Sequence, residues 1–151
     1  MSFLKTLAVG ATALWLGAAT LSAAEKGMMH CFAFTVIDSA SDADWQAFKA
    51  ATDAMPKKMK SVRKVWHGKL LQPLAVFRGD ADTRKKFTPN VNEAEGKFQR
   101  LMRQHGVCME FKESGPAVLK AYAADPYHAE WMKAYEKVRV AGTTTYDIVV
   151  E

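Results

Sequence analysis

Four short segments of this chain have the residue types of β-strands, and in residues 30–37 and 143–150 the side chains also alternate with a period of two. Two other segments repeat apolar residues with the period of a helix. Successive side chains of a β-strand point to opposite faces, so a period of two predicts strands. Apolar residues that recur at three- and four-residue steps are typical of one face of a helix. The predicted strands cover residues 30–37, 62–66, 107–111 and 143–150, and the predicted helical segments cover residues 42–55 and 116–142.

The order of these segments predicts the fold class. It is strand, helix, strand, then an irregular stretch, then strand, helix, strand. This order favours an α+β fold of the ferredoxin-like, split βαβ type, with a four-stranded antiparallel sheet and helices on one face, as in dimeric α/β barrels. The other face of the sheet would then lie open, and we expect it to form a homodimer with the same face of a second copy.

Two element ends are predicted from single residues. Trp45, Phe48, Thr52 and Met55 form one helical stripe, and Pro56 predicts that this helix ends near Met55. Gly142 is expected to end the last helix, and the residues 67–68 to end the second strand.

Residues 69–104 form an insert whose structure is the hardest to predict. Pro73, Pro89 and the pair at 79–80 interrupt it. Asn92, followed by Glu95 three residues later, resembles a capping box, and an apolar stripe follows it. The pattern predicts a short helix near residues 93–104. The insert is interpreted either as a lid over a cleft or as an added dimer contact.

The first 24 residues have the order of a secretory signal peptide. Lys5 precedes an apolar, uncharged run over residues 6–21, and Ser22-Ala23-Ala24 supplies the small residues of a cleavage site. The alternative, an uncleaved anchor, requires roughly 20 apolar residues, which is longer than this run. We expect cleavage after Ala24, a mature domain of residues 25–151, a secreted or periplasmic location, and no membrane attachment after cleavage.

Charge and composition narrow the classes of partner. The net charge of +5 is divided among separated clusters. Nucleic-acid binding favours a dense basic patch interleaved with stacking aromatic residues, so no nucleic-acid partner is predicted.

Several of these segments resemble the stress-responsive A/B-barrel (Dabb) family. The residues 30–34, 65–68, 107–111 and 145–149 are similar to its four strands. The best match is residues 119–128, which resemble the family's "Leu…Tyr-x-x-His-Pro-x-His" segment, although Asp125 stands in place of the first histidine. The resemblance covers nearly the whole mature chain outside the insert.

The resemblance implies a site as well as a fold. The plant olivetolic acid cyclase of this family closes a linear polyketide by an aldol step without metal or cofactor. By resemblance, His128 falls on its general base and Tyr122 on the neighbouring tyrosine, while His30 and His105 fall on histidines that line its pocket.

The alternation of the strands independently predicts a cleft between sheet and helices. His30 shares a strand face with Phe32 and Phe34, and His105 shares one with Met109. The helices would add Tyr122 and Trp131 over that face. An apolar cleft with a few polar groups is typical of small-molecule sites, so the chain is predicted to bind a small apolar or aromatic molecule. The predicted ligand-binding residues are His30, His105, Phe32, Phe34, Met109 and Trp131.

Three other interpretations stay open. A neutral His128 near a helix N-terminus could act as general base, with Tyr122 donating a hydrogen bond to an enolate oxygen, in a cofactor-free cyclase, isomerase or lyase. The same residues could instead only pack, in a structural or stress-protective dimer without a site. Convergence of His30, His105 and His128 would suit a metal. However, their spacing is not typical of ligands, so no metal or cofactor is predicted.

Cys31 and Cys108 are predicted on the open face of neighbouring strands. A disulfide within the chain, a disulfide between subunits, and two free thiols all fit this placement.

Overall fold

The computed structural model describes residues 27–88 and 90–150, so the predicted signal peptide lies outside the described residues. It contains four strands and four helices in the described part of the chain. They are β1 (Met28–Val36), α1 (Asp42–Lys58), β2 (Val62–Gly79), α2 (Ala81–Lys86), β3 (Phe98–Phe111), α3 (Pro116–Ala124), α4 (Pro126–Val138) and β4 (Arg139–Val149).

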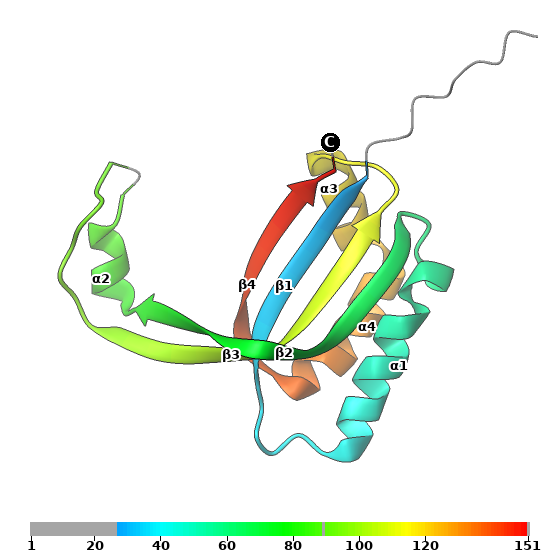
Figure 1. The fold of residues 1–151 in the computed structure, drawn as a ribbon, viewed down its shortest axis with the longest axis horizontal. Coiled ribbons are helices and arrows are strands. Elements are labelled where there is room, and N and C mark those ends of the chain that lie inside the picture. The colour runs from blue at the N-terminus through cyan, green and yellow to red at the C-terminus, as the bar shows by residue number, and fades with distance from the viewer. Residues whose placement is uncertain (1–26, 89, 151) are drawn as a thin grey trace, which may run out of the picture.

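The strands form one sheet in the order β2-β3-β1-β4, and all neighbours are antiparallel. Helices α1, α3 and α4 lie together on one face of this sheet, and the other face carries no helix (Figure 1). The predicted α+β, ferredoxin-like architecture is therefore confirmed. No described helix is long and apolar enough to cross a membrane.

The core lies between the sheet and α1, α3 and α4. Its fully buried aromatic side chains include Phe34 from β1, Phe48 from α1 and Trp131 from α4. Thr52 is a buried polar residue in this core. Its hydroxyl is satisfied there, because it donates to the Phe48 carbonyl (2.7 Å) and accepts from Trp131 Nε1 (3.0 Å). This pair of bonds fixes α4 over α1 at the depth of the core.

Helix α1 continues beyond the predicted end. Ser41 and Asp44 form a capping box at its start, as favoured at helix N-termini. The prediction that Pro56 ends the helix near Met55 is wrong, because Pro56 lies inside the helix and α1 reaches Lys58. A proline lacks an N–H donor and its ring crowds the preceding turn, but the Met59 N–H still donates to the Met55 carbonyl (2.8 Å), so the helix continues past Pro56. Burial of Met55 and Met59 holds this last turn against the core.

The insert is a hairpin and not a loop with a helix near residues 93–104. Strand β2 runs through Gly68 to Gly79, and β3 already begins at Phe98. After an irregularity between Lys69 and Leu74, the two strands pair again from Leu74–Arg103 to Gly79–Phe98. We call residues 74–103 the arm, and it extends away from the helices and past the lower end of β4 (Figure 1). The predicted helix is wrong because pairing with β2 outweighs the weak local helical pattern.

The tip of the arm contains the short helix α2, which the sequence pattern did not predict. Asp80 caps this helix by accepting from the Thr83 N–H (2.8 Å). Thr83 is buried and accepts from the Lys97 N–H (2.9 Å), which joins α2 to the returning chain.

The last helix ends earlier than predicted. Helix α4 ends at Val138, and β4 begins at Arg139. Gly142 therefore lies inside a strand, where its φ of +94° requires a residue without a Cβ atom.

Candidate functional site

A pocket of about 180 Å³ lies between the sheet and helices α3 and α4. Five of the eight predicted site residues line it, and Met132, Tyr135, Arg139, Thr143 and Thr145 complete the wall. The five are His30 and Phe32 from β1, Tyr122 from α3, and His128 and Trp131 from α4. We call it the His30 pocket.

The break between α3 and α4 places His128 in this pocket. Asp125 ends α3 and caps α4, where its carboxylate accepts from the Tyr127 N–H (2.8 Å). Pro126 occupies the first turn, as is favoured at helix starts. The His128 N–H donates to the Asp125 carbonyl (2.9 Å). The imidazole is thereby placed in the first turn of α4, facing Tyr122.

Tyr122 lies between the two histidines. Its ring centroid is 4.6 Å from that of His128, in an edge-on arrangement, and 5.7 Å from that of His30. The ring centroid of Trp131 also lies 5.7 Å from that of His128. The pocket therefore has aromatic walls that contain two imidazoles and the phenols of Tyr122 and Tyr135.

His30 has a partner that the sequence interpretation did not assign to the site. Its Nδ1 lies 2.6 Å from Oδ1 of Asp147. The two residues are directly paired in register on β1 and β4, so their side chains share one face. An ionised carboxylate only accepts hydrogen bonds, so Asp147 favours the tautomer with hydrogen on Nδ1 and a lone pair on Nε2. The signal in the sequence was the alternation of β4, which places Asp147 on this face only once the register is known.

Burial determines the protonation states of His128 and Tyr122. Burial lowers the pKa of His128, and the nearby His30 lowers it further, while Asp125 acts in the opposite direction. Burial also raises the pKa of the Tyr122 hydroxyl. At neutral pH the site therefore holds a neutral imidazole and a protonated phenol. The expected direction for His128 agrees with the helix N-terminus argument, but the main cause is burial.

The structure does not bring the other three predicted residues to this pocket. Phe34 and Met109 are fully buried core residues. His105 lines a separate hollow of about 660 Å³, where it packs on Trp45 with ring centroids 4.8 Å apart. In the described part of the chain, no three His, Cys, Asp or Glu side chains are grouped to hold a metal ion.

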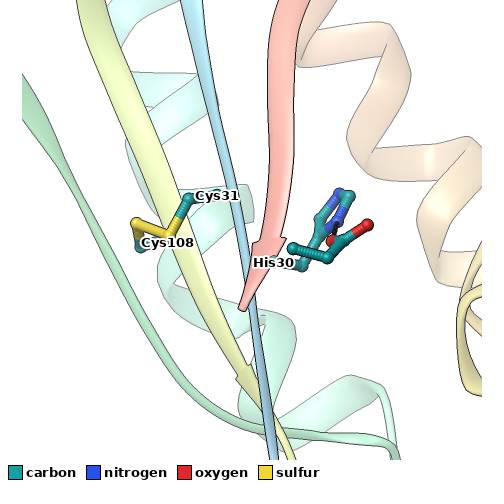
Figure 2. The surroundings of a disulfide bond; sticks show 4 residues. His30, Cys31 and Cys108 are labelled. Atoms are coloured by element: carbon teal, nitrogen blue, oxygen red, sulfur yellow. Dashed lines mark hydrogen bonds and ion pairs between the residues drawn. A yellow bond between two sulfur atoms is a disulfide. The ribbon is translucent and has the colours of Figure 1, made fainter. Parts of the chain in front are cut away.

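The two cysteines form a disulfide within the chain. Cys31 and Cys108 are directly paired on β1 and β3, with Cα atoms 4.1 Å apart. Figure 2 shows that the disulfide and the His30 side chain lie on opposite faces of β1. The disulfide belongs to the open face of the sheet, away from the His30 pocket.

Solved structures with the ferredoxin-like fold resemble this chain. A dimeric protein from Bacteroides fragilis is 17% identical, with a TM-score of 0.51 over 82% of this chain and 95% of the other. The hydroxynitrile lyase from Passiflora edulis is 12% identical, with a TM-score of 0.53 over 83% and 94%. A Dabb family protein from Mesorhizobium loti is 12% identical, with a TM-score of 0.51 over 84% and 99%. No protein-family model matches the chain, and no curated protein does. At these identities the likeness establishes the fold that Dabb proteins share.

Proposed function

We propose that this chain, which has the ferredoxin-like fold of Dabb proteins, binds a small molecule in the His30 pocket. The observation that carries the proposal is the meeting of His30, Tyr122 and His128 beside the aromatic side chains of the pocket, with Arg139 and two threonines as further polar groups in its wall. Aromatic side chains bury the ligand's apolar part, and the few polar groups set its orientation.

The size of the pocket limits the ligand. Its volume of about 180 Å³ lies below the roughly 300–1,000 Å³ typical of sites for drug-sized ligands. We therefore infer a ligand with one ring or a short chain, carrying a carbonyl or hydroxyl group. Such a group could accept from the protonated Tyr122 hydroxyl and donate to, or accept from, an imidazole.

A second candidate function is proton transfer without metal or cofactor, as in a cyclase, isomerase or lyase. The specific observation in its favour is the 2.6 Å contact between His30 and Asp147, which orients one imidazole and leaves its Nε2 free to accept a proton. In this candidate function His128 remains the predicted general base, or shares that role with His30, and Tyr122 is the hydrogen-bond donor to a developing enolate. One protein of similar fold is a hydroxynitrile lyase.

The proposal also includes a homodimer formed through the open sheet face. Trp66, Tyr146 and Ile148 expose apolar surface there. Trp66 and Tyr146 line a hollow of about 330 Å³ together with the disulfide, Leu70 and Leu74. A similar structure is described as dimeric. The alternative to a ligand-binding protein is a structural dimer that binds no ligand, and the binding screen distinguishes the two.

We further propose export to the periplasm or the outside of the cell. The disulfide supports this, because structural disulfides are rare where thiols are kept reduced. Mass spectrometry of the protein recovered from a bacterial host tests the cleavage, which should leave Glu25 as the first residue. Retention of residues 1–24 would contradict it.

The ligand proposal is tested by a binding screen that follows all four histidines. Small carbonyl and hydroxyl compounds with one ring are added while histidine NMR signals and the melting temperature are recorded. A ligand of the His30 pocket should shift the signals of His30 and His128 and raise the melting temperature. It should lose both effects in the variant His128→Ala.

His67→Gln is the matched control, because His67 lies on β2 beside Asp53, outside the pocket. Ligand effects should persist in that variant. Turnover of a bound compound that disappears in Asp147→Asn would favour the proton-transfer function over passive binding. No effect on His30 or His128 across the screen would favour the structural dimer.

A further inference from the structure

A further hollow of about 660 Å³, separate from the one that His105 lines, lies where the arm meets the start of β4. We call it the arginine hollow, because Arg78, Arg84 and Arg103 line it and no aspartate or glutamate of residues 27–88 and 90–150 does. Its remaining lining is mainly apolar and consists of Val76, Phe77, Gly79, Phe87, Phe98, Gly142 and Thr143. It shares only Thr143 with the His30 pocket.

Arg103 is the most unusual of these residues, because it is a charged side chain with only 3% of its surface exposed. Its Nη1 donates to the Thr35 hydroxyl (2.9 Å), and its Nε donates to the Thr144 hydroxyl (3.3 Å). A guanidinium has five N–H donors, so these two bonds leave donors free. No carboxylate of the described residues forms an ion pair with it.

A buried charge without a counter-charge is unfavourable, and buried charges in proteins are normally paired. Burial lowers the pKa of Arg103, and the positive charge of Arg78 lowers it further. The surroundings of Arg103 therefore oppose its charge, and an anion would relieve this.

The guanidinium groups of Arg78 and Arg103 both lie beside Gly142, and the absence of a side chain there leaves room for Arg78. A Cβ atom at Gly142 would lie 2.7 Å from Nη2 of Arg78 and 4.0 Å from Nη2 of Arg103. Arg78 is held there because its Nη2 donates to the Ala141 carbonyl (2.8 Å). Arg84 donates to the Gly79 carbonyl (3.3 Å) at the rim of the hollow.

The aromatic residues complete a site with two chemical parts. Phe77 is 65% exposed, and Phe87 and Phe98 are also exposed, with ring centroids of the last two 6.3 Å apart. We propose that the arginine hollow binds a small molecule that joins a carboxylate or phosphate to an aromatic body. The oxyanion contacts Arg78 and Arg103, as suits the forked donors of guanidinium groups. The aromatic body packs on the phenylalanines of the arm.

Calorimetric titration of the purified protein tests this site with four probes: phenyl phosphate, benzoate, inorganic phosphate and the uncharged benzyl alcohol. We expect phenyl phosphate or benzoate to bind at least tenfold more tightly than benzyl alcohol. The affinities of phenyl phosphate and benzoate show whether the site prefers a phosphate or a carboxylate. The difference in affinity between phenyl phosphate and inorganic phosphate measures the contribution of the aromatic body. The affinity should fall as salt is added.

Variants locate the binding. Arg103→Gln and Arg78→Gln should each weaken it at least tenfold, and Arg78 lies on the arm, outside the core cluster. The matched control is Arg100→Gln, which removes the same charge from the arm at a position outside the hollow, and it should change the affinity less than twofold. Binding should persist in His128→Ala, which separates this site from the His30 pocket.

Three results would overturn the proposal. They are the absence of binding by every charged probe at millimolar concentration, equal losses in Arg78→Gln and Arg100→Gln, and equal affinity for benzyl alcohol. A protein that binds no probe but loses its dimer in Arg103→Gln would show that a second copy supplies the counter-charge, which also overturns the proposal.

Discussion

The burial of His105 can be tested quantitatively, because it predicts how the free energy of unfolding depends on pH. Its side chain is 6% exposed, packs between Trp45 and Phe34, and has a buried Nε2 without a hydrogen-bond partner among the described residues. Burial is the main cause that lowers the pKa of His105 to about 4, and the charges of His67, Lys49 and Lys69 act in the same direction.

The sign of the effect follows from proton linkage. The unfolded chain protonates this histidine with an ordinary pKa of 6.5, whereas the folded protein does so only near 4. Between these values the unfolded state binds more protons, so stability is lost as the pH falls through 6.5 and continues to be lost until about pH 4. The full loss is about 3 kcal/mol, at 1.36 kcal/mol for each pKa unit. At pH 5 about 2 kcal/mol of it is expected.

The assay is urea denaturation of the wild type and of His105→Gln at pH 7 and pH 5. The wild type should lose about 2 kcal/mol more of its free energy of unfolding than the variant does between these pH values. His67→Gln should retain most of the wild-type loss, because burial and not the neighbouring charge dominates. Equal losses in the wild type and His105→Gln would refute the reasoning and show that the imidazole titrates normally in the folded protein.

Three further predictions concern the disulfide, the core and the open face. Reduction of the Cys31–Cys108 disulfide, which spans 77 residues, should lower the free energy of unfolding by about 4 kcal/mol in urea, and a change below about 1 kcal/mol would contradict this. Thr52→Val should cost about 1–3 kcal/mol in the same assay, because it leaves the buried Trp131 N–H without its acceptor; an unchanged midpoint would refute it. Ile148→Glu should halve the mass measured by light scattering, because it places a charge on the open face. A wild-type protein that is already a monomer by light scattering would refute the proposed homodimer.

Much of the fold could be predicted because the signals that specify it are local. The alternation in β1 and β4, the capping residues of α1 and the proline starts of α3 and α4 each lie within a few residues of the element they define. The element order then leaves few arrangements for the sheet. The arm could not be predicted, because the strand pairing that forms it is not local in the sequence. The residues 98–103 have an apolar spacing that fits a helix, and only pairing with residues 74–79, which lie more than 18 positions earlier in the chain, makes them a strand.

The candidate site, like the fold, could be predicted only in part from the sequence. The sequence by itself indicated that Tyr122 and His128 lie close together, because they flank one helix break, and that His30 shares a strand face with Phe32 and Phe34, because side chains alternate along a strand. Only the tertiary structure decided that Asp147 meets His30, that His105 lies in a different hollow, and that Arg103 is buried without a carboxylate. The physical reason is that sequence patterns report which face a side chain occupies, whereas partners across a sheet depend on strand register and on the bend of β2 and β3.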